Sequence, residues 1–217
     1  MKMKLTVIGV PLLFALTAAA EDVPRMETFL GYTYVRANSA TNVPAFSANG
    51  GGGQFVYNFN KWLGVVADLG AVHNGNISGV HLDTTMTNFL LGPRVTLRKG
   101  RLAPYFNVLW GGVYGSTSTE FTAVLAPGVM PPIYIPGAGN VVENLGQAIS
   151  TRVVANQTAF AMTAGGGLDI KISKSLSFRP IGIDYYMTRL QNLRSATDNN
   201  QHNIRYTAGV NFTFGAQ

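Results

Sequence analysis

Histidine side chains suit both acid–base chemistry and metal binding near neutral pH, and the sequence contains three of them, His73, His81 and His202. His81 lies close to Ser78 and Asp83. A serine beside a histidine that a carboxylate orients is the arrangement of an activated nucleophile. Such a triad depends on spatial geometry, which spacing within one short segment does not provide. The sequence therefore predicts no catalytic site and no enzyme, and the histidines are too dispersed to predict a metal site.

A run of four glycines, Gly50–Gly53, does not predict a phosphate-binding loop. It lacks the lysine and the following helix that such a loop requires, so we expect it to let a strand bend or approach its neighbour closely. The chain has no cysteine, which excludes disulfides and thiolate metal sites. No cofactor is predicted.

Ionic side chains recur on one face of segments that alternate between apolar and polar residues. The clearest segment runs from Ile204 to Phe214, where every second residue is apolar and the residues between are polar or glycine. Successive side chains of a strand point to opposite faces, so this period of two predicts a strand. Eight such segments are predicted: Glu27–Arg36, Gly51–Phe59, Trp62–His73, Thr84–Arg98, Leu102–Tyr114, Thr158–Ile172, Leu176–Arg189 and Asn203–Gly215.

The polar faces of these segments carry charges of both signs, whereas the apolar faces are almost free of charge. This polarity is the reverse of a lipocalin-type barrel, and it predicts an outer face in lipid and a polar interior. Backbone groups in a bilayer must be paired internally, so only a closed barrel can host such strands. The predicted fold is an all-β, eight-stranded, antiparallel, up-and-down transmembrane barrel. Its predicted interior network consists of Asp68, Arg94, Asn107, Asp169, Asp184 and Arg205.

Ion pairs are expected inside, because an isolated buried charge is costly. Asp68 and Arg94 lie at similar heights above their turns on neighbouring segments, and we predict that they pair. Asp184 and Arg205 have the same relation and are also predicted to pair. Arg179 falls on the apolar side of its segment, which places it at the membrane interface or indicates a bulge at Pro180.

Composition supports a membrane location. Only 12% of residues are charged, against about 25% in a typical soluble domain. Residues 1–20 have two lysines, a short apolar run and an Ala-x-Ala site, which predicts a signal peptide and a mature barrel over residues 21–217. The formal charge of +6 includes two lysines of that peptide, and this small basic excess does not predict nucleic-acid binding.

The connections alternate in length. Three are tight turns, and four are longer, at about residues 37–50, 74–83, 115–157 and 190–202, which is the arrangement of periplasmic turns and extracellular loops. The longest connection contains an apolar, proline-rich stretch. This stretch predicts either a binding surface, formed by Met130, Ile133, Tyr134 and Ile135, or a loop that covers the mouth or is disordered.

Several phrases resemble a known family. Phe29–Arg36, Lys61–Asp68, Leu91–Arg94 and Gly165–Asp169 are similar to motifs of outer-membrane β-barrel domains related to the transmembrane domain of outer-membrane protein A, most closely in acidobacterial versions. The last segment resembles the C-terminal signal that the barrel-assembly machinery recognises. The residues of that signal are Gly209, Phe212 and Phe214. The resemblance implies the outer membrane of a Gram-negative bacterium, with outer-membrane lipid, lipopolysaccharide and the assembly machinery as partners.

The resemblance implies no single activity, since such barrels serve several roles. We expect a structural and interaction protein that presents extracellular loops to a ligand that the sequence does not identify. A narrow pore for ions or small solutes is the first alternative, although eight strands and a charged lumen argue against a wide channel. A lipid A-modifying enzyme that uses His81 is the second alternative.

Overall fold

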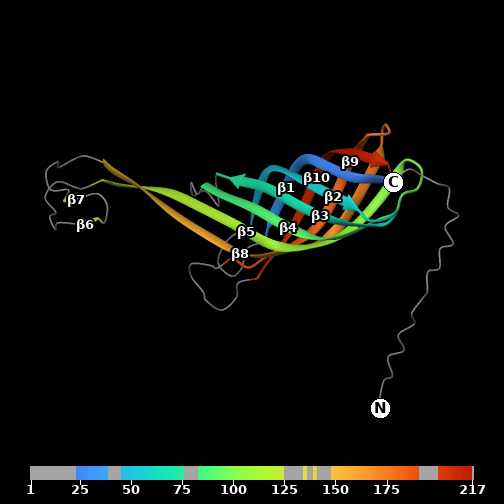
Figure 1. The fold of residues 1–217 in the computed structure, drawn as a ribbon. Coiled ribbons are helices and arrows are strands. Elements are labelled where there is room, and N and C mark those ends of the chain that lie inside the picture. The colour runs from blue at the N-terminus through green and yellow to red at the C-terminus, as the bar shows by residue number, and fades with distance from the viewer. Residues whose placement is uncertain are drawn as a thin grey trace, which may run out of the picture.

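The computed structural model describes residues 23–38, 45–75, 83–124, 134–135, 139–140, 148–190 and 200–216. Most of these residues form a closed antiparallel barrel (Figure 1). The barrel strands are β1 (Pro24–Ala37), β2 (Phe46–Asn58), β3 (Leu63–Asn74), β4 (Asp83–Thr96), β5 (Leu102–Val124), β8 (Ala148–Lys171), β9 (Leu176–Thr188) and β10 (Gln201–Ala216). Each pairs with the next barrel strand along the chain, and β10 closes on β1. The predicted eight-stranded, up-and-down fold is confirmed.

The structure also describes a few residues that do not belong to the barrel. Two short strands, β6 (Tyr134–Ile135) and β7 (Gly139–Asn140), pair with each other. None of the described residues forms a helix long and apolar enough to cross a membrane. The predicted signal peptide, residues 1–20, lies outside the described residues.

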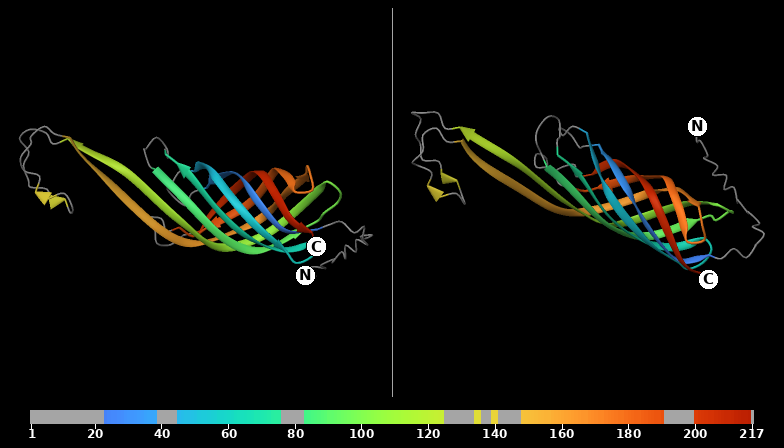
Figure 2. Two further views of the ribbon diagram at one scale, coloured as in Figure 1. Left: turned by 45° about the horizontal axis from the view of Figure 1, so that its top comes forward. Right: turned by 90° about the horizontal axis from the view of Figure 1, so that it is seen from above.

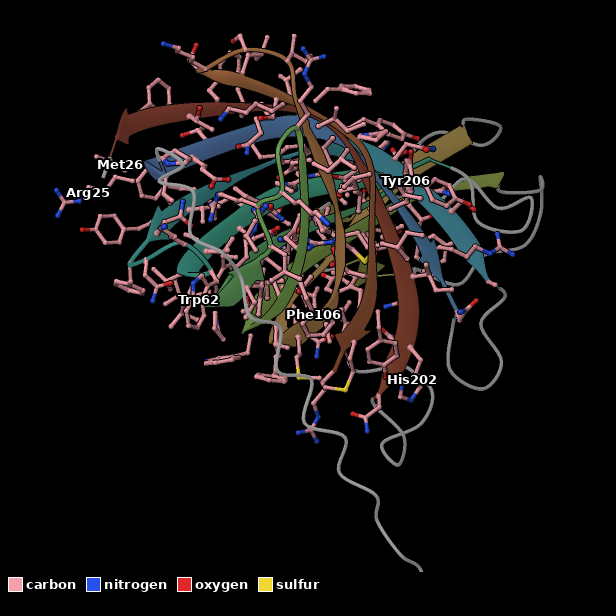
Figure 3. All side chains as sticks on the ribbon, turned by 90° about the vertical axis from the view of Figure 1, so that its right-hand side faces the viewer. Arg25, Met26, Trp62, Phe106, His202 and Tyr206 are labelled. Carbon is pink, nitrogen blue, oxygen red and sulfur yellow. The ribbon has the colours of Figure 1, made fainter. Side chains whose placement is uncertain are left out.

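The outer face of the barrel is apolar, as the alternation predicts. Large hydrophobic side chains such as Leu30, Phe89 and Ile183 are about half exposed, because they point away from the lumen. Figure 3 shows Met26, Trp62 and Phe106 among the side chains that surround the barrel near its turn end. Eight aromatic residues near the ends of the barrel strands are exposed on this face: Phe59, Trp62, Phe106, Tyr114, Phe160, Phe178, Phe212 and Phe214.

The connections at the turn end are tight. Strands β5 and β8 are far longer than predicted. β5 has 23 residues and β8 has 24, whereas the other barrel strands have between 12 and 16. The pairing of β4 with β5 ends at Ser118, and the pairing of β9 with β8 ends at Ala161. Beyond these points β5 and β8 continue to pair with each other as far as Val124 and Ala148.

This two-stranded extension, residues 119–124 and 148–153, is called the β5–β8 ribbon below. Both views of Figure 2 show it projecting away from the barrel at the end opposite the C-terminus. Six residue pairs in a ribbon span about 20 Å. The prediction of a loop over residues 115–157 is therefore wrong for its two ends. The segment Ser116–Thr119 is polar on both faces, so alternation of hydrophobicity could not reveal a strand there.

Candidate functional site

The charged side chains that could do chemistry lie mainly inside the barrel. The six residues of the predicted interior network are all buried: Asp68, Arg94, Asn107, Asp169, Asp184 and Arg205. Glu27, Gln54, Tyr105 and Arg179 are buried with them, and the sequence-based prediction of the network did not include these four. The alternation of polar and apolar residues could have identified Gln54 and Tyr105, because both lie on the polar faces of their strands.

Asp169 of β8 is the shared anion of the first interior cluster. Its Oδ1 accepts a hydrogen bond from Nε of Arg179 at 2.7 Å, and its Oδ2 accepts one from Nη2 of Arg179 at 3.1 Å. The same Oδ2 accepts a third from Nη2 of Arg94 at 2.8 Å. The two bonds from Arg179 form the paired fork that guanidinium and carboxylate groups favour. Two arginines share one carboxylate here, so this cluster has an excess positive charge.

The ring of Tyr105 lies against both arginines of this cluster. Cζ of Arg94 is 3.8 Å and Cζ of Arg179 is 4.3 Å from the ring centroid. The ring of Phe29 approaches Arg179 at 4.0 Å. Cation–π contacts are worth up to about 2 kcal/mol when they are desolvated. The aromatic rings therefore stabilise the excess charge that Asp169 alone does not neutralise.

Two glycines make room for Tyr105. A Cβ atom at Gly167 would lie 2.7 Å from Oη of Tyr105, and a Cβ atom at Gly182 would lie 2.8 Å from the same oxygen. Both distances are shorter than van der Waals contact. The absence of side chains on β8 and β9 at this level thus gives the tyrosine its position beside the arginines.

Arg205 of β10 is the shared cation of the second cluster. Its Nε donates to Oδ2 of Asp184 at 3.0 Å, and its Nη1 donates to Oδ1 of Asp68 at 3.0 Å. Asn88 also donates to Oδ1 of Asp68, at 2.5 Å. The expected pair of Asp184 and Arg205 is present, because the two residues are direct partners in the register of β9 and β10. This cluster has an excess negative charge.

Gln54 joins the two clusters. Its Nε2 donates to Oδ2 of Asp68 at 2.8 Å, and its Oε1 accepts from Nη1 of Arg179 at 2.8 Å. A carboxylate only accepts and a guanidinium only donates, so these two neighbours fix the orientation of the amide. The joined network contains three arginines and three aspartates, and its charges balance.

A separate ion pair lies nearer the turns. Nη2 of Arg98 is 2.5 Å from Oε1 of Glu27. Asn58 donates to the same oxygen at 2.8 Å, and Asn211 donates to Oε2 at 2.9 Å. Glu27 is buried and Arg98 is partly exposed, so this pair closes the interior network toward the turn end.

The predicted pair of Asp68 and Arg94 is wrong. In the register of β3 and β4, Asp68 is opposite Leu90 and Arg94 is opposite Gly64, so the two residues are four positions apart. The prediction measured heights above two different turns. Neighbouring strands of a tilted barrel are staggered, so equal heights do not place residues side by side. Each residue instead pairs across the lumen, Arg94 with Asp169 and Asp68 with Arg205.

Arg179 lies inside because β9 contains a bulge. Between Arg179 and Gly182 the strand advances three residues, while β10 advances two, from Thr207 to Gly209. The register of β8 against β9 shifts in the same region. Of the two alternatives that the sequence left open, a bulge at Pro180 is therefore correct. Proline cannot donate to a ladder, so it is tolerated where pairing is interrupted. The extra residue turns Arg179 from the lipid side to the lumen.

Not every interior polar group is satisfied. Both amide atoms of Asn107, Oγ1 of Thr163 and Nη1 of Arg94 are buried and have no hydrogen-bond partner among the described residues. Buried polar groups of this kind commonly bind an ordered water. We infer no ligand from them.

The lumen also contains an apolar layer, which the prediction of a polar interior did not include. Val35, Val72 and Val113 lie toward the loop ends of β1, β3 and β5, and all are buried. They belong to a single cluster with Ala48, Val56, Val66, Met86, Leu90, Leu109, Ala161 and Tyr186. An eight-stranded barrel is just wide enough for side chains to fill, so apolar packing completes the interior that the ionic network begins.

The histidines are not brought together. Nδ1 of His73 is 3.1 Å from Oγ1 of Thr85, and His73 is exposed. His202 forms a hydrogen bond with Oη of Tyr185, and the two rings stack with centroids 5.8 Å apart. His81 lies outside the described residues. No cluster of three metal-binding side chains occurs in the described part of the chain.

The other residues predicted to form sites lie at the surface or outside the described residues. Met130 and Ile133 are outside the described residues, and Tyr134 and Ile135 form the short strand β6. Phe212 and Phe214 of the predicted assembly signal are exposed on the outer face of β10. Gly209, the third residue of the signal, packs closely against β1: a Cβ there would lie 2.3 Å from the carbonyl oxygen of Leu30.

Comparison with known proteins gives a family match. The model of the outer membrane protein beta-barrel domain family matches residues 5–214. No curated protein sequence matches the chain significantly.

Solved structures that are similar in fold include the following two proteins. The attachment invasion locus protein Ail of Yersinia pestis has a TM-score of 0.54 at 15% identity, over 88% of this chain and 99% of Ail. Neisserial surface protein A has a TM-score of 0.55 at 12% identity, over 87% of this chain and 97% of that protein. At these identities the likeness shows the shared fold alone.

Proposed function

Because the chain belongs to the outer membrane protein beta-barrel domain family, we propose that it is a structural and interaction protein of the outer membrane, without enzymatic activity. In this proposal a signal peptide exports the chain. The barrel contacts outer-membrane lipid and lipopolysaccharide, and the barrel-assembly machinery inserts it. The extracellular loops and the β5–β8 ribbon are presented to partners outside the cell.

The observation that carries the proposal is the contrast between a filled interior and a long external ribbon. The ribbon reaches about 20 Å past the last residue pairs that other strands share. Its described side chains include Val153, which is 50% exposed, and its free edges offer unpaired backbone groups to an extended segment of a partner. A chain that only anchored itself in the membrane would not need this extension.

The filled interior argues against the narrow pore. A solute that entered from the turn end would have to separate Arg94 and Arg179 from Asp169, which costs several kcal/mol for a buried ion pair. It would then meet the apolar layer around Val72 and Val113. The side chains of both layers are packed, so neither layer offers a hydrated path.

Labelling of single cysteines tests the proposed orientation, and the chain has no cysteine of its own. Val153→Cys places a thiol in the ribbon, and Lys99→Cys places one in an exposed turn at the opposite end. A bulky, membrane-impermeant maleimide should label the ribbon thiol on intact cells. It should label the turn thiol only after the outer membrane is permeabilised. The reverse pattern would contradict the proposal.

Two further measurements separate the alternatives. The refolded barrel should show no stable conductance in planar bilayers, and openings that respond to Arg205→Gln would favour a pore instead. The interaction role is tested by a chain in which an Asn-Gly turn replaces residues 119–153, joining the paired residues Ser118 and Val154. Cells that display this shortened chain should adhere less to one another or to surfaces than cells that display the full chain. Equal adhesion in every assay would leave the ribbon without the proposed role.

A further inference from the structure

The turn end of the barrel contains a pocket of about 450 Å³. It lies between the start of β1, the end of β10, and the turns that connect β4 to β5 and β8 to β9, the end of the molecule that faces the viewer in Figure 3. Its volume is within the range of small-molecule sites, about 300–1,000 Å³. The pocket is therefore large enough for a small solute or a headgroup.

Buried polar residues form the inner wall of this pocket, and basic residues form its rim. The inner wall includes Glu27, Asp169 and Asn211, all of which are buried. The rim carries four basic side chains: Arg98, Arg101, Lys171 and Lys174. These residues come from two different turns, so the barrel closure, and not a local charge run, brings them together.

The charges of the pocket do not cancel. Asp169 is already paired with Arg94 and Arg179, and Glu27 is already paired with Arg98. The remaining rim cations, Arg101, Lys171 and Lys174, form no ion pair with any described residue. Three cations around one cavity, next to carboxylates that are already neutralised, give the pocket an excess positive charge. Positive charges gathered around one cavity add their potentials and attract anions.

One wall residue also has an unused hydrogen-bonding group. Nδ2 of Asn211 donates to Oε2 of Glu27, which fixes the amide orientation, and its Oδ1 is buried without a hydrogen-bond partner. This oxygen is an acceptor and is shielded from the pocket, so it does not bind an oxyanion, and the capacity of the pocket for an anion rests on its basic rim.

We propose that this pocket binds an oxyanion, a phosphate or carboxylate group, held by Arg101, Lys171 and Lys174. Arginine offers paired donors to such groups, and lysine offers a compact charge that can adjust its position. The phosphate can belong to a free solute or to the headgroup of an anionic lipid, because both present the same oxygens to the rim. The proposal does not depend on the role of the β5–β8 ribbon.

The test uses the full barrel, refolded in nanodiscs of a zwitterionic lipid, with inorganic phosphate and citrate as probes in calorimetric titrations. Binding should weaken as salt rises, because the contacts are partly exposed charges. Arg101→Gln, Lys171→Gln and Lys174→Gln should each lower the affinity by about two- to fivefold, as expected for a single partly exposed charge. The matched controls are Lys99→Gln and Lys61→Gln, which remove turn charges outside the pocket and should change the affinity less.

Nanodiscs that contain phosphatidylglycerol distinguish the two sources of phosphate. Competition between this lipid and inorganic phosphate would identify a headgroup site, and undiminished phosphate binding would identify a site for a free solute. Both results support the pocket. The proposal is overturned if neither probe binds, or if the two control substitutions weaken binding as much as the three pocket substitutions. Circular dichroism of each variant confirms that the barrel is folded before the titration.

Discussion

The two interior clusters differ in how their charges are shared, and this difference makes a quantitative prediction. Asp169 is the only carboxylate that pairs with Arg94 and Arg179 among the described residues, at distances of 2.7–3.1 Å. Asp169→Asn therefore leaves two buried guanidinium groups without an anion. Removal of one partner from a buried pair costs about 3–5 kcal/mol, so we expect the free energy of unfolding to fall by at least that amount.

Asp184→Asn is the matched control. It removes a carboxylate of the same kind from the same interior, but Arg205 keeps its contact with Asp68 at 3.0 Å. The expected cost is that of a hydrogen bond to a charged group, about 1.5–3 kcal/mol. Asp169→Asn should therefore be the more destabilising substitution by about 2 kcal/mol.

The assay is unfolding of the refolded barrel in guanidinium chloride in lipid vesicles, followed by tryptophan fluorescence. Both tryptophans, Trp62 and Trp110, are more than half exposed on the outer face, so their emission reports contact with lipid. Addition of Arg179→Met to Asp169→Asn should recover part of the lost stability, because one unpaired cation is removed. Equal costs for the two aspartate substitutions, or a cost below about 1 kcal/mol for Asp169→Asn, would refute the assignment of Asp169 as the shared anion.

Three further substitutions test separate features in the same way. Gly182→Ala should cost about 1–3 kcal/mol of unfolding free energy, because its Cβ would lie 2.4 Å from Oγ1 of Thr207 and 2.8 Å from Oη of Tyr105. The control is Gly51→Ala, which should be nearly neutral in the same unfolding assay because the atom nearest to its Cβ would be 3.6 Å away. Gln54→Leu should lower the free energy of unfolding by about 1–3 kcal/mol, because it removes the acceptor of Arg179 and one donor to Asp68. A smaller effect would mean that water replaces the amide. Phe214→Ala should reduce the amount of assembled barrel in cells more than Phe106→Ala does. Both residues are about half exposed on the turn side, so Phe106→Ala is a matched control. Equal amounts of assembled barrel for the two variants on heat-modifiability gels would contradict the assembly signal.

The sequence predicted the strands of the barrel because lipid imposes a uniform chemical demand on one face. From Ile204 to Phe214, every outward position must be apolar, so a period of two is visible without any tertiary information. Where β5 continues past Ser118, this demand no longer operates. The strand is still present, but the segment Ser116–Thr119 that leads into it is polar on both faces, so no alternation of hydrophobicity reveals it.

The interior partners could not be predicted from the sequence for a different reason. Pairing across a lumen depends on the stagger between strands and on bulges, and neither is visible in the alternation. A shift of four residues separates Asp68 from Arg94, and one extra residue near Pro180 moves Arg179 from the lipid side to the lumen. The Pro180 signal was present in the sequence, but only the register of β9 with both neighbours decides between a bulge and an interfacial arginine.

The bulge in β9 determines the charge balance of the whole interior. Without Arg179, the buried network would contain two arginines, Arg94 and Arg205, against three aspartates, and one carboxylate would be uncompensated in a medium where that is costly. With Arg179 turned inward, the charges balance, and Gln54 can connect both clusters into one network. A neutral and connected network resists hydration, because opening it at any point exposes unpaired charges. Selection for a conducting lumen would favour the opposite design, so chemistry that this barrel performs with solutes or partners is expected at its ribbon and at its turn-side pocket.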